Sequence, residues 1–253
     1  MSKFWNIVSR VTDAADVVLL MLDARMIEET RNRDIEKMVI KTGRPLIYVI
    51  TKRDLITQET MQRWKRELSP CVFVSSTTYH GLAQLKELIL TEARKADIHK
   101  RKIEVGVLGY PNVGKSSLIN AMTGRSSAKA SPRAGLTRSR KRISSVRGNI
   151  VFVDTPGIIP TSERKPRLSS VKHAMIGAVD YDREKEPDLV IFALMEKHPG
   201  LIEKHYGVPA HDDKEETLVA IALKRRLLSK GNTPNIRRTA VLILKEWQAG
   251  EIR

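Results

Sequence analysis

The sequence has little cysteine, few aromatic residues and no long apolar run. Cys71 is the only cysteine among 253 residues, which excludes an intramolecular disulfide and a metal site built from several cysteines. Aromatic residues make up only 5%, which argues against base stacking and for reading of the phosphate backbone if RNA is bound. Runs such as Val17 to Leu22 are far shorter than a membrane span, and residues 1–4 do not begin a secretory signal. We therefore expect a cytoplasmic protein without membrane contact.

Negative charge is scarce relative to positive charge. Lys and Arg number 45 against 29 Asp and Glu, which gives a net charge of +16 at pH 7. A balance this basic indicates contact with a polyanion such as nucleic acid. Hydrophobic residues make up 41% and charged residues 29%, a composition typical of folded rather than disordered chains. The length allows two domains, each with its own core.

Five short apolar runs predict buried strands, because each is rich in β-branched residues and is bounded by polar turns. They cover residues 17–22, 46–50, 72–74, 105–108 and 150–153. Segments with helical spacing lie between them, at 27–41, 59–68, 82–96 and 115–122. This alternation predicts an α/β fold with a mostly parallel sheet and helices on both faces.

The pattern changes after Thr161. The segment Ser162 to Leu168 contains proline and arginine, and the later segments have helical periodicity without a convincing strand. We expect helices at 187–196, 215–228 and 234–249, the last beginning with Pro234 and ending at Gly250. The prediction is an α/β domain over 1–168 and a small all-α domain over 169–253.

Residues 109–117 read Gly-Tyr-Pro-Asn-Val-Gly-Lys-Ser-Ser and come directly after a predicted strand. This is the pattern of a P-loop, in which glycines let backbone amides wrap around phosphate. Lys115 offsets charge on the terminal phosphates, the Ser116 hydroxyl ligates Mg²⁺, and Ser117 supports the α-phosphate. The expected nucleotide contacts are Gly109, Asn112, Val113, Gly114, Lys115, Ser116 and Ser117.

A P-loop does not distinguish ATP from GTP, but two further motifs favour guanine. Thr51-Lys52-Arg53-Asp54 ends a predicted strand and resembles the [Asn/Thr]-Lys-x-Asp motif of GTPases. Its carboxylate, on Asp54, accepts hydrogen bonds from guanine N1 and N2, and adenine would leave it unsatisfied. Ser75-Ser76-Thr77 stands where the family has Ser-Ala-Lys, with Thr77 in place of the lysine.

A fourth motif bears on the γ-phosphate. Asp154-Thr155-Pro156-Gly157 comes after the last predicted strand and resembles the motif whose aspartate holds Mg²⁺ through water and whose glycine amide senses the γ-phosphate. Thr137, between this motif and the P-loop, is the expected switch threonine on Mg²⁺. We expect Lys115, Thr137 and Gly157 to act in catalysis, and Ser116, Thr137 and Asp154 to hold the metal.

The order of the motifs is inverted, because both guanine motifs precede the P-loop. Circular permutation explains this order, and the hydrophilic segment 94–102 would rejoin the original termini. Nearly the whole chain resembles the circularly permuted GTPases of the YlqF/YawG family, also called ribosome biogenesis GTPase A. The resemblance includes these motifs, Asp23-Ala24-Arg25 after the first predicted strand, and Trp247 to Gly250 near the end of the chain.

The resemblance implies hydrolysis of GTP to GDP and phosphate, and an assembly role on the large ribosomal subunit and its rRNA. We expect the protein to be a monomer. Ile158 occupies the position where Ras-like GTPases carry a water-orienting glutamine, so intrinsic hydrolysis should be slow. Asn112 resembles the asparagine that ligates potassium in cation-activated GTPases. Family members usually carry a histidine ahead of the first strand, and residues 1–15 here contain none.

Two alternatives stay open at this point. The protein could be a non-catalytic, nucleotide-regulated RNA-binding switch, or a GTPase acting on another RNA. Basic residues crowd the segment around Thr137, so that nucleotide state could gate RNA contact; a solvated basic loop is the simpler interpretation. These residues are Arg125, Lys129, Arg133, Arg138, Arg140, Lys141 and Arg142.

Overall fold

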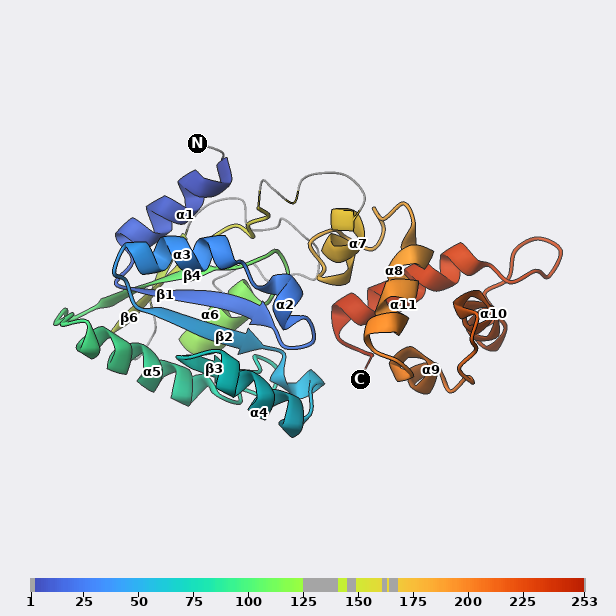
Figure 1. Cartoon of the computed structure of the whole chain (residues 1–253), viewed down its shortest axis with the longest axis horizontal. Coiled ribbons are helices and arrows are strands. Elements are labelled where there is room, and N and C mark those ends of the chain that lie inside the picture. Colours follow the sequence, from blue (N-terminus) through green and yellow to red (C-terminus); the bar gives the residue numbers. More distant parts are fainter. Residues whose placement is uncertain (1–2, 125–140, 145–148, 161–162, 164–167, 253) are drawn as a thin grey trace. The chain divides into compact units, whose positions relative to one another are not determined.

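A computed structural model describes residues 3–124, 141–144, 149–160, 163 and 168–252 (Figure 1). The chain divides into two compact units, Met1–Arg164 and Lys165–Arg253. We call them the N-terminal unit and the helical unit and describe each by itself. In the part of the chain that the structure describes, no helix is both long and apolar enough to cross a bilayer.

The N-terminal unit is built on a six-stranded sheet with the order β3-β2-β1-β4-β6-β5. Neighbouring strands are parallel except β5, which runs antiparallel to β6. The mostly parallel sheet expected from the sequence is confirmed. Strand β5 was not expected, because its sequence Lys-Arg-Ile-Ser contains a single apolar residue. The strands are β1 (Val17–Asp23), β2 (Leu46–Thr51), β3 (Cys71–Phe73), β4 (Ile103–Leu108), β5 (Lys141–Ser144) and β6 (Ile150–Asp154).

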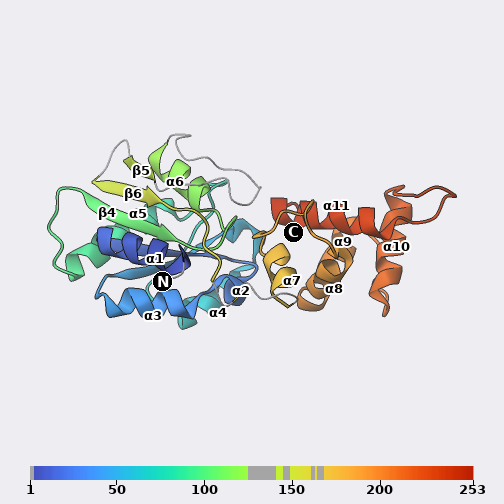
Figure 2. The same ribbon diagram turned by 90° about the horizontal axis from the view of Figure 1, so that it is seen from above.

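Helices cover both faces of this sheet (Figures 1 and 2). On one face α1 (Lys3–Ala14) and α3 (Arg33–Lys41) share a hydrophobic core with β1 and β2. On the other lie α5 (Leu82–Lys95) and α6 (Lys115–Thr123). Burial from both sides explains why every residue of β1 is buried and why the strand is apolar up to its last residue, Asp23.

The helices of this unit differ from the sequence prediction at two places. Helix α1 was not expected from the sequence. It lies close to β4 because Gly106 has no side chain: a Cβ on Gly106 would be 2.7 Å from Val11 Cγ1. The expected helix 27–41 is two helices, α2 (Ile27–Thr30) and α3. The break falls at Asn32, whose side chain accepts hydrogen bonds from the amides of Asp34 and Ile35 and so starts a new helix. The remaining elements are η1 (Arg53–Leu55) and α4 (Gln58–Glu67).

The described part of the helical unit contains α7 (Leu168–Met175), α8 (Pro187–Lys197), α9 (Leu201–Tyr206), α10 (Lys214–Lys224) and α11 (Ile236–Ala249). Helix α11 was expected to begin at Pro234, but its cap is Asn235, whose side chain accepts from the Arg238 amide at 2.9 Å. It ends at Gly250 as expected, with φ +79°. Helix α10 ends at Lys224, four residues early, because the chain turns into an antiparallel bridge between Leu228 and Pro234.

Trp247 and Gln248 explain the sequence at the end of α11. The Trp247 ring is buried, and its Nε1 donates to the Met175 carbonyl at 2.8 Å. Gln248 Nε2 donates to the carbonyls of Ala174 and Val179, both at 2.9 Å. Ala174 and Met175 lie in the last turn of α7, where carbonyl groups have no partner within the helix, and Val179 lies in the loop that follows. The pair thereby joins the first and last helices of the unit.

The segment expected to rejoin the permuted termini is fixed to the sheet by Asp16. Its buried carboxylate accepts from Lys100 Nζ at 2.7 Å and from the Glu104 amide at 2.9 Å. The Asp16 amide in turn donates to the Glu104 carbonyl at 2.7 Å. The starts of β1 and β4 are therefore held together beside the segment that is expected to rejoin the permuted termini.

We predict that Asp16→Ala destabilises the N-terminal unit by about 1–3 kcal/mol, because the Glu104 amide loses its side-chain acceptor. Urea unfolding together with hydrogen exchange of the Glu104 amide measures the effect. Asp13→Ala, which removes an exposed carboxylate three residues earlier, should change stability by less than about 0.5 kcal/mol. Equal losses in the two variants would contradict the role given to Asp16.

Candidate functional site

The P-loop lies between β4 and α6 and takes backbone conformations that its sequence allows. Gly109 has φ +151°, Asn112 +59° and Gly114 +97°. A Cβ on Gly109 would lie 2.9 Å from the Met21 carbonyl oxygen, so the loop passes too close to β1 for any side chain. Gly114 is the N-cap of α6. The loop thus leads into a helix N-terminus, where free amides bind phosphate.

Lys115 lies at the start of α6 and is 6% exposed. Its Nζ donates to the carbonyls of Gly109 at 3.1 Å and Tyr110 at 2.5 Å, within its own loop. Burial lowers the pKa of Lys115 from 10.5 to about 8, and the Asp154 carboxylate opposes this only in part. The ammonium group is therefore poorly compensated, and an anion entering the loop would stabilise it.

The expected Mg²⁺ residues come from two elements that meet beside the P-loop. Ser116 Oγ, on α6, donates to Asp154 Oδ2, at the end of β6, over 3.3 Å. A hydroxyl and a carboxylate are hard oxygen donors of the kind that Mg²⁺ prefers, so these residues fit that ion. Ser117 is exposed on the first turn of α6. Thr137, the second expected hydroxyl, lies outside the described residues.

Gly157 rests directly on the P-loop. A Cβ at this position would lie 2.5 Å from Pro111 Cα, so only glycine fits. The next amide, of Ile158, donates to the Gly109 carbonyl at 3.1 Å. The Thr155 hydroxyl donates to the Val107 carbonyl at 2.6 Å and fixes the start of the same loop to β4. The loop after β6 is thus coupled to the loop after β4 through backbone contacts.

Ile158 is 4% exposed and belongs to the hydrophobic core between the sheet and helices α1 and α3. The sequence places this residue where Ras-like GTPases carry a glutamine that orients water. Its burial among apolar side chains accounts for an isoleucine here, because a glutamine would place an unsatisfied amide in the core.

Thr51 joins the guanine motif to the P-loop. Its buried hydroxyl lies 2.7 Å from the Val113 carbonyl and 2.9 Å from the Leu22 carbonyl, and its single proton can serve either. Lys52 takes a left-handed conformation, with φ +56°, that turns the chain into η1. Asp54 lies half-buried in that turn. The structure therefore brings residues 51–54 beside residues 109–117.

The second guanine loop lies beside the first. The Arg53 amide donates to the Val74 carbonyl at 3.1 Å. The buried Ser75 hydroxyl is 2.9 Å from Thr77 Oγ1 and accepts from the Thr78 amide at 3.2 Å. Ser76 is half-buried and Thr77 exposed. These bonds give residues 75–77 a fixed turn although Thr77 replaces the family lysine.

Asp23 and Arg25 were noted in the sequence only as part of the family pattern, and the structure gives them a position in the site. Asp23 is 1% exposed. Its Oδ1 accepts from the Arg25 amide and Nε, at 3.0 and 3.1 Å. Its Oδ2 accepts from Arg25 Nη2 at 2.9 Å and Lys52 Nζ at 2.7 Å. The sequence feature that could have indicated this role is the position of Asp23, a charged residue directly after the apolar run of β1.

Opposing effects act on the Asp23 carboxyl. Burial alone would raise its pKa, but the cations of Arg25 and Lys52 hold the pKa well below its usual range. Burial likewise lowers the pKa of Lys52, and Asp23 opposes that shift. The ionised carboxylate therefore fixes the Lys52 side chain, and with it the guanine motif, against the end of β1.

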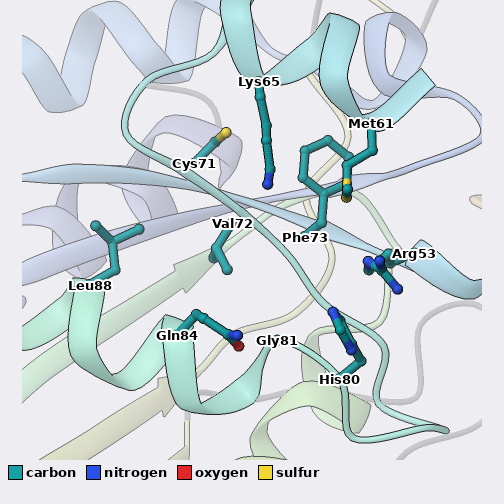
Figure 3. Close-up of a pocket in the computed structure, with 10 residues that line it drawn as sticks. All are labelled: Arg53, Met61, Lys65, Cys71, Val72, Phe73, His80, Gly81, Gln84 and Leu88. Atoms are coloured by element: carbon teal, nitrogen blue, oxygen red, sulfur yellow. The ribbon is translucent and has the colours of Figure 1, made fainter. Parts of the chain in front are cut away.

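A cavity of about 450 Å³ lies next to the guanine loops, against β3 and between α4 and α5 (Figure 3). Arg53 and His80 reach it from the two loops, and Met61, Val72 and Phe73 give it apolar walls. None of its lining residues belongs to the P-loop. It is therefore separate from the place where the phosphates of a nucleotide would lie.

The basic residues around Thr137 are only partly within the described chain. Lys141 and Arg142 lie on β5. Arg125, Lys129, Arg133, Arg138 and Arg140 lie outside the described residues.

Comparison with known proteins agrees with this geometry. A family model described as 50S ribosome-binding GTPase matches residues 104–225, beginning within the strand before the P-loop. An uncharacterized GTP-binding protein of Methanocaldococcus jannaschii is 35% identical over 98% of this chain and 65% of its own length. Nuclear GTP-binding protein NUG1 of Saccharomyces cerevisiae is 34% identical over 98% of this chain and 54% of its length. The chain thus spans less than two thirds of these relatives.

Solved structures extend the likeness to the whole fold. GDP-bound YlqF superposes with a TM-score of 0.64 at 22% identity, covering 96% of this chain and 94% of that one. GNP-bound YlqF from T. maritima gives a TM-score of 0.65 at 21% identity, covering 99% and 95%. The guanine motifs follow β2 and β3, which precede the P-loop strand β4 in the chain and lie in the same sheet, with β1 between β2 and β4. The chain therefore has a P-loop GTPase fold with circularly permuted motif order, similar to the fold of the YlqF structures.

Proposed function

We propose that this protein binds GTP with Mg²⁺, hydrolyses it to GDP and phosphate, and acts as a cytoplasmic monomer in assembly of the large ribosomal subunit. The observation that carries the proposal is the hydrogen bond from the Thr51 hydroxyl to the Val113 carbonyl. It fixes a guanine-selective loop to a phosphate-binding loop within one site. The family model named for 50S ribosome binding supports the choice of particle.

Different residues bind the guanine base and the phosphates in this proposal. Asp54 accepts from guanine N1 and N2, and residues 75–77 face O6 with a backbone amide. Lys115 turns from its loop carbonyls to the terminal phosphates, and the Gly157 amide donates to the γ-phosphate. Ser116 and Asp154, with Thr137, would hold Mg²⁺, which when bound neutralises charge between the β- and γ-phosphates.

Contact with rRNA is proposed for the segment from Lys224 to Arg238, which contains no acidic residue. We call it the basic segment. Its Lys224 Nζ is held by the Gly207 carbonyl at 2.7 Å, and Arg237 Nη1 by the Lys185 carbonyl at 2.6 Å. Fixed, exposed cations of this kind suit recognition of a phosphate backbone. The cations are Lys224, Arg225, Arg226, Lys230, Arg237 and Arg238, all exposed.

We predict that Asp54→Asn changes base preference. The asparagine amide would place a donor opposite the N1 and N2 donors of guanine, so GTP affinity should fall at least about 100-fold. Xanthosine triphosphate, with an oxygen at position 2, should bind the variant better than GTP does. Calorimetric titration of both nucleotides measures this. Equal losses for GTP and ATP in the variant would contradict a role in base selection.

A pH dependence is predicted from Lys115. Its folded pKa of about 8 lies below 10.5, so between these values the unfolded chain holds a proton that the folded chain lacks. Stability of the nucleotide-free protein should therefore rise with pH across this window, by at most about 3 kcal/mol. Lys115→Met should lose this rise, as measured by urea unfolding at pH 7.5 and 10.

Bound GDP and Mg²⁺ should also abolish this rise in the wild-type protein, because phosphate stabilises the charged lysine. Lys86→Met, on the exposed surface of α5, is the matched control and should keep it. A rise that persists in Lys115→Met would assign it to another group.

Turnover should depend on potassium and on the ribosomal particle. The buried Ile158 cannot orient the attacking water, so an external group or ion has to orient that water or stabilise the charge of the transition state. We expect GTP turnover to be at least tenfold faster with potassium and large ribosomal subunits than with sodium and no subunits. Asn112→Gly, which keeps the positive φ but removes the side-chain oxygen, should lose the potassium effect. Lys115→Ala should lose turnover altogether.

The non-catalytic switch predicts another result in the same assay. Tight GTP binding without stimulation by subunits, in either salt, would favour it over the GTPase. Stimulation by a different RNA alone would favour the other alternative, a GTPase that acts elsewhere.

A further inference from the structure

The central part of helix α8, Leu189 to Met195, is apolar around its whole circumference, and charged residues stand only near the two ends of the helix. Val190, Ile191 and Leu194 are fully buried against the other helices of the unit. Leu189 is 44% exposed, and Phe192 and Ala193 are only half-buried. A helix that is apolar on all sides is normally covered on all sides. Among the described residues of the helical unit, one side of α8 is left partly uncovered.

This side of α8 forms the floor of a groove of about 760 Å³. Leu189, Phe192 and Ala193 are spaced by three and four residues, as one side of a helix requires, and Val171 of α7 adjoins them. Carboxylates surround this floor. The lining acidic residues are Glu186, Glu196, Asp212, Asp213 and Glu215, and we call the whole the acidic groove.

Charge in the acidic groove is opposite to that of the chain. Among the described residues that line the groove, Lys214 is the one cation, and its Nζ donates to Glu196 Oε1 at 2.7 Å. Four further acidic residues line the groove, in a protein of net charge +16. Phosphate groups would be repelled here, so the groove is unsuited to RNA.

We propose that the acidic groove docks a basic amphipathic segment of a partner protein. Apolar side chains of that segment would cover Leu189, Phe192 and Ala193, and its lysines or arginines would pair with the surrounding carboxylates. The inference goes beyond the proposed function, because it concerns a protein partner and needs no nucleotide.

The groove and the basic segment lie at opposite ends of α10. Asp213 caps the start of this helix, accepting from the Glu215 amide at 2.8 Å, and the basic segment begins at its last residue, Lys224. Eleven helical residues separate the ends by about 16 Å. The helical unit therefore presents a surface for a basic protein and a surface for RNA on one rigid element.

The test uses the full chain and a fluorescein-labelled helical peptide of leucine and lysine, with leucine at positions i, i+3, i+4 and i+7. Fluorescence anisotropy at low ionic strength measures binding, and the same peptide with glutamate for lysine is the charge control. Glu196→Lys with Asp212→Lys removes acidic charge from the groove. The matched variant Glu216→Lys with Asp182→Lys makes the same change in net charge at exposed positions outside the lining.

We expect the lysine peptide to bind, the groove double variant to weaken binding at least about tenfold, and the matched variant to change it less than about twofold. Leu189→Ser, at an exposed position where folding should tolerate it, should also weaken binding. Thermal unfolding verifies that each variant is folded.

No binding of the lysine peptide, equal loss in the two double variants, or equal binding of the glutamate peptide would overturn the proposal. Displacement of the peptide by an RNA hairpin whose own affinity falls in the groove variant would assign the groove to RNA instead. Because the measurement is made without nucleotide, its failure would leave the proposed GTPase function untouched.

Discussion

One buried hydroxyl, on Thr51, connects the two halves of the nucleotide site. It lies within hydrogen-bonding distance of carbonyls from β1 and from the P-loop, the latter 62 residues further along the chain. Two loops that recognise different parts of one ligand need a fixed separation, because each has to reach its own part of the same bound molecule. A threonine suits this position better than a longer side chain, since its short hydroxyl holds the loops in direct contact.

A second constraint is electrostatic. Asp23 is buried at the end of an apolar strand, and its charge is tolerated only because Arg25 and Lys52 surround it with four hydrogen bonds. Removing either cation would take away part of this compensation, and removing both would leave an uncompensated buried charge, which is far more costly than the intact network. The guanine motif is thus positioned by a residue that does not belong to it, on a strand that circular permutation has moved to the beginning of the chain.

Permutation also places a different segment after the loop that is proposed to sense the γ-phosphate. Gly157 and Ile158 contact the P-loop through backbone atoms, and the chain continues from there into the helical unit. A shift of this loop on loss of the γ-phosphate would therefore act directly on the segment leading to that unit. With a basic segment at one end of α10 and the acidic groove at the other, the proposed partners are an RNA and a basic protein, which are the two components of a ribosomal particle.

The sequence by itself determined the P-loop, the order of the motifs, five of the six strands and the helical character of the C-terminal part, because local periodicity and glycine placement specify local backbone geometry. Tertiary structure decided the rest. Only packing shows that Asp23 pairs with Lys52, that Ile158 belongs to the core and that one side of α8 is left partly uncovered. Strand β5 likewise depends on pairing with β6, since its own residues carry no apolar pattern. Such contacts join residues distant in the chain, and no local pattern encodes which of them will meet.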